Sequence, residues 1–279
     1  FPNIGSTCKS NFVTFFRWNS IRIKSCSNKL TFTRKNFPSF FNFCIFIQQV
    51  FKTFLILGSQ LALVFGICLF VIKRSRQAAA NGRQFLGVTF TEETNSRGEL
   101  DLQPSDTGTG LHVLTSAMIV SMFAMVFAAN LSLTWGLILM TTTSLTLGPV
   151  LGMIMLSVDE HDGLRALQLT VMITFGAGVV GLYSGIDFSV LGIFLFFALL
   201  ALLSLRIVML FTNFASGQRR NIAIAGAVLF TLFLLYDFNR LAALNDQGVN
   251  DWETALRIAV SLYLDIVNLL LELMEAMGE

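Results

Sequence analysis

Two aspartates in the apolar C-terminal part of the chain are its clearest candidates for chemistry. Asp237 stands in the stretch LLYDFNRL, and Asp265 stands in SLYLDIVNL. A charge at membrane depth costs roughly 2.5–3.5 kcal/mol on insertion scales, so such residues usually face a partner or a water-filled cavity. Both aspartates are therefore candidates for binding a proton or an ion.

Two carboxylates at hydrogen-bonding distance cannot both ionise cheaply in a low dielectric, so they would share a proton. Such a pair can act as a pH-dependent latch that is closed when it shares a proton and repels when both groups ionise. Its oxygens are also the hard ligands that Ca²⁺ prefers. The alternatives are structural. Asp265 would then bond Asn268 or a neighbouring tyrosine hydroxyl, and Asp237 would reach the interface beside Arg240.

The residues around Asp265 form a polar stripe on an apolar helix. The stripe has spacings of 4, 4, 3, 4 and 3 residues and comprises Arg257, Ser261, Asp265, Asn268, Glu272 and Glu275. These spacings place the six residues on one helical face, which should point into a bundle or a water cavity rather than into lipid. We expect Glu272 and Glu275, near the chain end, to be solvated at the interface.

The composition predicts an all-α multi-pass membrane protein. Hydrophobic residues make up 54% of the chain and charged residues 13%, whereas soluble domains are about a quarter charged. Seven apolar runs are long enough to span a bilayer. They lie at 54–72, 112–129, 131–156, 165–185, 188–211, 221–243 and 253–277. Short links between the later runs predict a bundle of antiparallel neighbours.

The charge distribution divides the chain in two. Residues 1–91 hold twelve Lys and Arg and no acid, while 92–279 hold seven Arg and seventeen acids. We predict a basic N-terminal arm at 1–53, either a tail or a targeting remnant, and a transmembrane domain at 54–279. Within the domain, the polar segment 73–111 is predicted to be a solvent-exposed loop. The apolar segment 37–51 is too short for a span and is predicted to be interfacial or buried.

The remaining motifs indicate how the helices pack and which classes of function the sequence does not support. Two GxxxG motifs, Gly148 to Gly152 and Gly181 to Gly185, predict close helix packing within the bundle. The cysteines and histidines match neither a zinc pattern nor a disulfide framework. No G-x-S-x-G, H-E-x-x-H or phosphate-binding loop occurs, and the Gly-Leu-Gly-Asp-type motif of intramembrane aspartyl proteases is absent. We therefore expect no enzyme, no cofactor and no nucleic-acid partner.

Three stretches resemble the transmembrane Bax-inhibitor-motif (Bax inhibitor-1-like) family. They are FTLFLLYDFNRL at 230–241, SLYLDIVNLLLELM at 261–274 and LTLGPVLG at 145–152. The resemblance implies a seven-helix bundle with a di-aspartyl pH sensor that gates a calcium leak, and an association with cell-death suppression in eukaryotes. By position, Asp237 and Asp265 would be the sensor pair. Tyr236, Tyr263 and Asn268 fall in the same motifs as supporting residues.

The chain departs from the family pattern in its charges. Bacterial members use an arginine between the second and third helices to bind the first aspartate, but no Arg or Lys occurs from 98 to 164. We hypothesise that Arg206 or Arg240 supplies the counter-charge. Residues 112–156 also contain no carboxylate. A non-conducting membrane scaffold or regulator, with structural carboxylates, is therefore the alternative to a channel.

The expected partners are the lipid bilayer, Ca²⁺ and other membrane proteins. The membrane would be an endoplasmic-reticulum-like endomembrane, an organellar inner membrane or a bacterial plasma membrane. The positive-inside rule leaves the orientation open, because the basic arm and the clusters at 73–76 and 219–220 favour opposite sides under seven spans.

Overall fold

The computed structural model describes residues 39–94, 100–106, 108–129, 132–158, 160–186, 188–212 and 216–278. It contains seven helices and two strands in these ranges. In chain order they are α1 (Ser39–Ala80), β1 (Thr89–Thr94), β2 (Leu100–Asp106), α2 (Thr109–Ala128), α3 (Leu133–Ser157), α4 (Glu160–Tyr183), α5 (Leu191–Phe211), α6 (Ser216–Asp246) and α7 (Trp252–Met277).

All seven described helices are long and apolar enough to cross a membrane. The seven-span fold predicted from the apolar runs is confirmed, and the protein is an integral multi-pass membrane protein. The last six helices begin and end within about five residues of the predicted spans, because a run of roughly 20 apolar residues is a strong signal.

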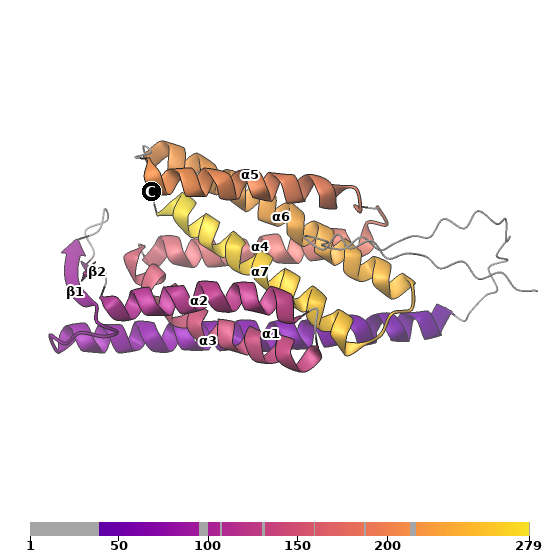
Figure 1. Cartoon of the computed structure of the whole chain (residues 1–279), viewed down its shortest axis with the longest axis horizontal. Helices are drawn as coiled ribbons and strands as arrows, with labels where there is room; N and C mark the ends of the chain where they lie inside the picture. The colour runs from indigo at the N-terminus through magenta and orange to yellow at the C-terminus, as the bar shows by residue number, and fades with distance from the viewer. Residues whose placement is uncertain are drawn as a thin grey trace, which may run out of the picture. The chain divides into compact units, whose positions relative to one another are not determined.

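Helix α7 is the central helix of the bundle. It packs against α1, α3, α4 and α6, with α6 as its main partner, and Figure 1 shows it passing diagonally between its neighbours. In its most apolar window 72% of the residues are buried, whereas the corresponding share for α5 is 11%. The polar groups in the middle of α7, such as Ser261 and Asp265, are thus held within protein, while α5 is the helix most exposed to lipid.

Helix α1 is longer than a bilayer requires. Its 42 residues extend about 63 Å at 1.5 Å per residue, about twice the hydrocarbon thickness. The helix starts at Ser39, so it continues through the predicted boundary at residue 53 and includes most of the segment 37–51. Residues 1–38 of the predicted arm lie outside the described residues, and the division into arm and membrane domain stays a prediction.

The N-terminal part of α1 is bound to the loop between α6 and α7. The Lys52 ammonium donates to Asn250 Oδ1 at 2.7 Å and lies 5.3 Å from the ring centre of Trp252. Gln49 donates to the Asp251 carbonyl at 3.4 Å. These contacts place the extra turns of α1 against the start of α7.

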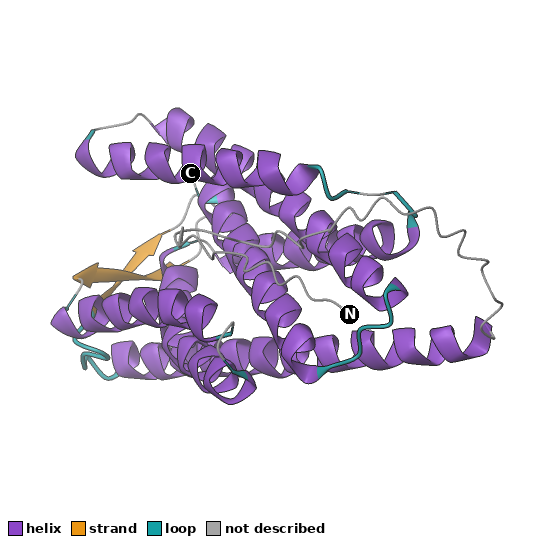
Figure 2. Cartoon of the chain, turned by 45° about the vertical axis from the view of Figure 1, so that its right-hand side comes forward, coloured by secondary structure: helices purple, strands orange, loops and turns teal. Residues whose placement is uncertain are grey.

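The sequence predicted a continuous loop for the polar segment 73–111, and this prediction is wrong. Its first residues extend α1 to Ala80, and an antiparallel hairpin of β1 and β2 follows, drawn in orange in Figure 2. The strand register shifts beside Pro104, a residue that cannot donate to a ladder and is found at bulges. Polar composition alone did not distinguish this short hairpin from a loop.

Three of the four GxxxG glycines pack between helices, as predicted. A Cβ on Gly148 would lie 2.7 Å from Ile67 Cβ of α1, and one on Gly181 would lie 2.6 Å from Phe238 Cβ of α6. Gly152 likewise contacts α1. The prediction is wrong for Gly185, which follows the end of α4 with a φ of 65°. Glycine favours this left-handed conformation after a helix end.

Candidate functional site

The side chains of Asp237 and Asp265 meet at the interface of α6 and α7. Only 1% and 7% of their respective surfaces are exposed. The two side chains lie within hydrogen-bonding reach of each other, and Ser261 reaches Asp237 as well. In both carboxyl groups the Oδ2 atom is buried and lacks a hydrogen-bond partner among the described residues. The site therefore combines two adjacent acids with an unused acceptor on each.

The short loop between α6 and α7 explains how the two aspartates come together. Asp237 precedes the last residue of α6 by nine positions, and Asp265 follows the first residue of α7 by thirteen. These separations correspond to about 13 Å and about 20 Å of helix. The start of α7 is exposed at Trp252 and Glu253, so the extra turn of α7 projects beyond the buried interface and the carboxyl groups reach the same level.

This arrangement suits a pair that holds one proton. An ionised carboxylate can only accept hydrogen bonds. Two ionised groups in contact would repel strongly in a low dielectric, and their Oδ2 atoms would stay without a donor. A single proton removes the repulsion, because the protonated group can donate to the ionised one.

Arg240 is a cation close to Asp237, the first aspartate of the pair. It lies three residues after Asp237 on α6, and its charge and that of Asp237 also act on the Tyr236 hydroxyl. Helix α3 carries no charged residue between Leu133 and Ser157, and on α1 the Lys52 ammonium is bound to the α6–α7 loop. Of the two arginines that the sequence suggested as counter-charges, Arg240 is the one whose charge acts on Asp237.

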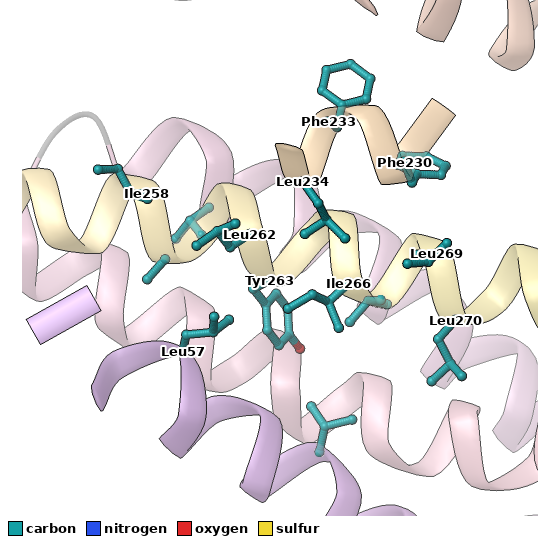
Figure 3. Packing of buried hydrophobic residues seen from close by; sticks show 14 of the residues in the cluster. Leu57, Phe230, Phe233, Leu234, Ile258, Leu262, Tyr263, Ile266, Leu269 and Leu270 are labelled. Carbon is teal, nitrogen blue, oxygen red and sulfur yellow. The ribbon is translucent and has the colours of Figure 1, made fainter. Parts of the chain in front are cut away.

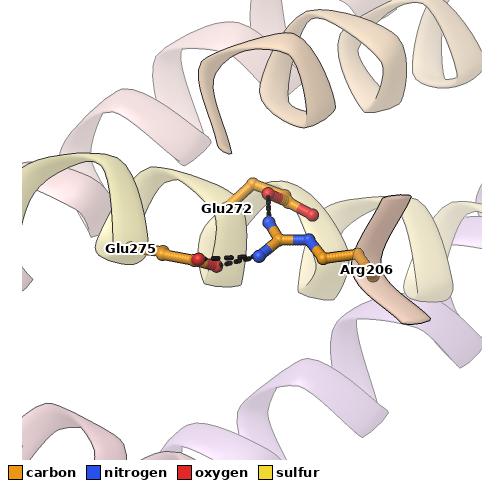
Figure 4. Close-up of polar contacts among 3 residues, drawn as sticks. All are labelled: Arg206, Glu272 and Glu275. Atoms are coloured by element: carbon orange, nitrogen blue, oxygen red, sulfur yellow. Dashed lines mark hydrogen bonds and ion pairs between the residues drawn. The ribbon is translucent and has the colours of Figure 1, made fainter. Parts of the chain in front are cut away.

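Arg206 instead forms a separate ion-pair cluster, shown in Figure 4. Its guanidinium on α5 donates to both oxygens of Glu275 at 2.6 Å and to Glu272, both on α7. The prediction that these glutamates are simply solvated is wrong, because their side chains are only 34% and 12% exposed. The hypothesis that Arg206 balances the aspartates does not hold in this structure, since its donors are directed to the two glutamates.

The supporting residues predicted from the motifs have different surroundings. Tyr263 is fully buried, and its hydroxyl lies 3.2 Å from that of Ser144 on α3. Tyr236 is half-buried and packs against Gly192 of α5. Asn268 is half-buried on α7, about one turn beyond Asp265. The roles predicted for these residues remain predictions.

The sequence did not identify the polar residues that connect Tyr263, through Ser144, to α1 and α3. Gln60 on α1 and Ser144 on α3 are buried at the same level, and Thr141 accepts a hydrogen bond from Gln60. Uncharged polar residues are common in membrane helices, so they attract little attention one by one. The run TTTS at 141–144 was the available signal, since four successive hydroxyls in an apolar helix are unusual.

The two aspartates would form at most part of a calcium site. Ca²⁺ takes six to eight oxygen ligands, and two carboxyl groups offer four. Among the described residues no group of three or more His, Cys, Asp or Glu side chains could hold a metal ion. The two aspartates alone therefore do not complete the coordination of a bound Ca²⁺.

Comparison with known proteins identifies the family. The sequence profile described as "Inhibitor of apoptosis-promoting Bax1" matches residues 46–279. The chain belongs to the Bax inhibitor-1-like family. The resemblance seen in the three motifs is thereby confirmed, and the matched region covers all seven spans of this Bax inhibitor-1-like protein.

Several individual proteins are similar to parts of the chain. An uncharacterized protein of Helicobacter pylori is 28% identical over 167 residues, covering 58% of this chain and 69% of that protein. Protein LIFEGUARD 1 of Arabidopsis thaliana is 31% identical over 114 residues, covering 40% of this chain and 46% of its own length. An uncharacterized protein of Campylobacter jejuni is 32% identical over 110 residues, 39% of this chain and 45% of that protein. The chain thus matches about half the length of several relatives.

Proposed function

We propose that this Bax inhibitor-1-like protein is a pH-sensitive calcium (cation) leak channel with a cytoprotective role, gated by Asp237 and Asp265. The single observation that carries the proposal is the contact of these two buried carboxyl groups, each with an Oδ2 that lacks a donor. With one proton on the pair, α6 and α7 are held together and the path is closed. With both groups ionised, their repulsion separates the helices and lets cations pass.

The sign of the pH response follows from this arrangement. Raising the pH removes the shared proton, so the leak should increase with pH. For a single proton the change is at most about tenfold per pH unit. Asp265→Asn should hold the pair closed at every pH, because the asparagine amide can donate to Asp237 as the protonated acid does.

Calcium flux from liposomes, measured against pH, tests the proposal. The parent should leak more at higher pH, while Asp237→Asn and Asp265→Asn should lose the pH response. Asp246→Asn is a matched control, because Asp246 lies on the same helix but is exposed, and it should behave like the parent. A parent protein without flux at any pH would eliminate the channel, and an unchanged pH response in Asp265→Asn would eliminate the gate.

A non-conducting scaffold is the second candidate function. The absence of carboxylates from 112–156 favours it, because α2 and the described part of α3 then offer a cation no acidic lining. In this case the aspartates would lock α6 to α7, and the substitutions would change stability without any flux to alter.

The relatives come from bacteria and a plant, which is compatible with each of the three predicted membranes.

A further inference from the structure

Helix α7 has a second polar face opposite the aspartate pair. Successive residues of a helix are rotated by about 100°, so Asp265 and Tyr263 point about 160° apart. Asp265 and Ser261 face α6, whereas the Tyr263 hydroxyl contacts Ser144 of α3. Figure 3 shows the Tyr263 ring directed away from Leu234 of α6 and toward Leu57 of α1. One rotation of α7 therefore determines both contacts.

The second face forms a continuous hydrogen-bonded chain across three helices. The hydroxyls of Tyr263 and Ser144 are 3.2 Å apart, and the Ser144 hydroxyl donates to Gln60 Oε1 at 2.9 Å. The Gln60 amide then donates to Thr141 Oγ1 at 3.2 Å. The Thr141 hydroxyl donates to the Leu137 carbonyl at 2.9 Å. Together these bonds connect α7 with α1 and α3.

The Ser144 hydroxyl lies at the junction of these bonds and has one proton to donate. It is within reach of Gln60 Oε1 at 2.9 Å and of the Tyr263 hydroxyl at 3.2 Å. The Met140 carbonyl of its own helix, at 3.0 Å, is a third acceptor. If Tyr263 donates to Ser144 and Ser144 donates to Gln60, each of the three groups uses a donor and finds an acceptor. Tyr263 is fully buried and Gln60 is 9% exposed, so water does not offer an easy alternative. This arrangement of the three helices therefore satisfies the hydrogen bonds of all three side chains.

These hydrogen bonds differ from the apolar contacts around them because they are directional. Apolar side chains pack nearly as well after a small rotation or slide, whereas hydrogen bonds weaken steeply with angle and distance. Interhelical hydrogen bonds in membranes contribute only modestly to stability. Their effect here is to specify the rotation of α7, in the way that single polar residues set register in helical bundles.

We propose that Tyr263, Ser144 and Gln60 form a positioning network that holds α7 in the rotation at which Asp265 meets Asp237. The inference rests on the proposed function for its biological meaning, but the contact it describes can be measured without any flux. Loss of the network lets α7 rotate, separates the carboxyl groups and weakens their sharing of a proton.

The test is infrared spectroscopy of the protonated carboxyl band against pH, with the full chain in nanodiscs. Asp265→Asn and Asp237→Asn identify the band of the pair. In Tyr263→Phe and Ser144→Ala, the midpoint of the band should fall by about half a pH unit, as expected for the loss of one buried hydrogen bond. Tyr183→Phe is the matched control, because Tyr183 is 72% exposed, and its midpoint should equal that of the parent.

Two variants keep the test decisive if one of them folds poorly, and thermal unfolding identifies which are folded. A midpoint equal to that of the parent in the folded network variants would overturn the positioning role, even with a pH-dependent flux intact. The opposite result, a shifted midpoint in a protein without flux, would support the network and reject the channel. Failure of the two proposals is therefore distinguishable.

Discussion

Replacing Arg206 by Met should lower the free energy of unfolding, mainly because two glutamates lose their ion-pair partner and only slightly because packing is lost. Arg206 is the cation that binds Glu272 and Glu275, and it connects the lipid-exposed helix α5 to the central helix α7. Methionine keeps most of the apolar stem but removes the charge. The two glutamates then face each other without their partner.

The size of the effect follows from burial. Removing one partner of a fully buried ion pair costs about 3–5 kcal/mol. Glu272 is 12% exposed, but Glu275 and Arg206 are 34% and 26% exposed, so solvent screening reduces the cost to about 2–3 kcal/mol. Glu272 cannot easily move toward α6, because its carboxyl group packs against Gly226, where a Cβ would lie 2.5 Å from Glu272 Cδ.

Reversible unfolding in detergent micelles, followed by circular dichroism, gives the free energy of unfolding. We expect Arg206→Met to lose about 2–3 kcal/mol and the triple variant Arg206→Met, Glu272→Gln, Glu275→Gln to recover to within about 1 kcal/mol of the parent, because neutral groups leave no charge without a partner. Equal stability of the single and triple variants would refute this reasoning, since the glutamate charges would then carry no cost.

Two further predictions concern the packing of α4 on α6 and the N-terminal cap of α7. Gly181→Ala should lower the free energy of unfolding by about 1–3 kcal/mol, because the new Cβ would lie 2.9 Å from the Leu235 carbonyl oxygen; Gly176→Ala, with nothing within 4 Å, is the control and should be neutral. Asp251→Ala should cost about 1 kcal/mol, because Asp251 Oδ1 accepts the Thr254 N–H at 2.7 Å, whereas Asn should retain most of the cap. Partial burial acts to raise the pKa of Asp251, but hydrogen bonds from Thr254 outweigh it and lower that pKa. The ionised Asp251 carboxylate therefore contributes its full stability above the ordinary aspartate pKa. This contribution is lost as the pH falls through the lowered pKa of Asp251, so the free energies of unfolding of the parent and of Asp251→Asn should become equal in acid.

The sequence was sufficient where the signal is local. Runs of about 20 apolar residues predicted the seven spans, and a short loop between the last two runs made α6 and α7 neighbours, so Asp237 and Asp265 could be paired in advance. The hairpin at 89–106 was missed because its strands are short and polar. The stripe along α7 was recognised from its spacing, and Ser261 and Asp265 are buried as expected, but its first member, Arg257, is 42% exposed.

Contacts between distant elements could not be predicted in the same way. Arg206 and Glu275 are 69 residues apart, and no periodicity relates a residue on α5 to one on α7. The charges alone allowed Arg206 to approach the aspartates or the glutamates, and the packing of α5 decided between them. Gln60 and Ser144, which are 84 residues apart, are uncharged, and no spacing in the sequence indicated that they bond each other or that Ser144 contacts Tyr263.

The decisive measurement for the proposed gate is the pH profile of calcium flux through the parent and Asp265→Asn, reconstituted in parallel. The leak should rise with pH in the parent and stay low and flat in the variant. A parent leak that falls or stays constant as pH rises, or a variant that keeps the parent's profile, would contradict a gate built on the shared proton of Asp237 and Asp265.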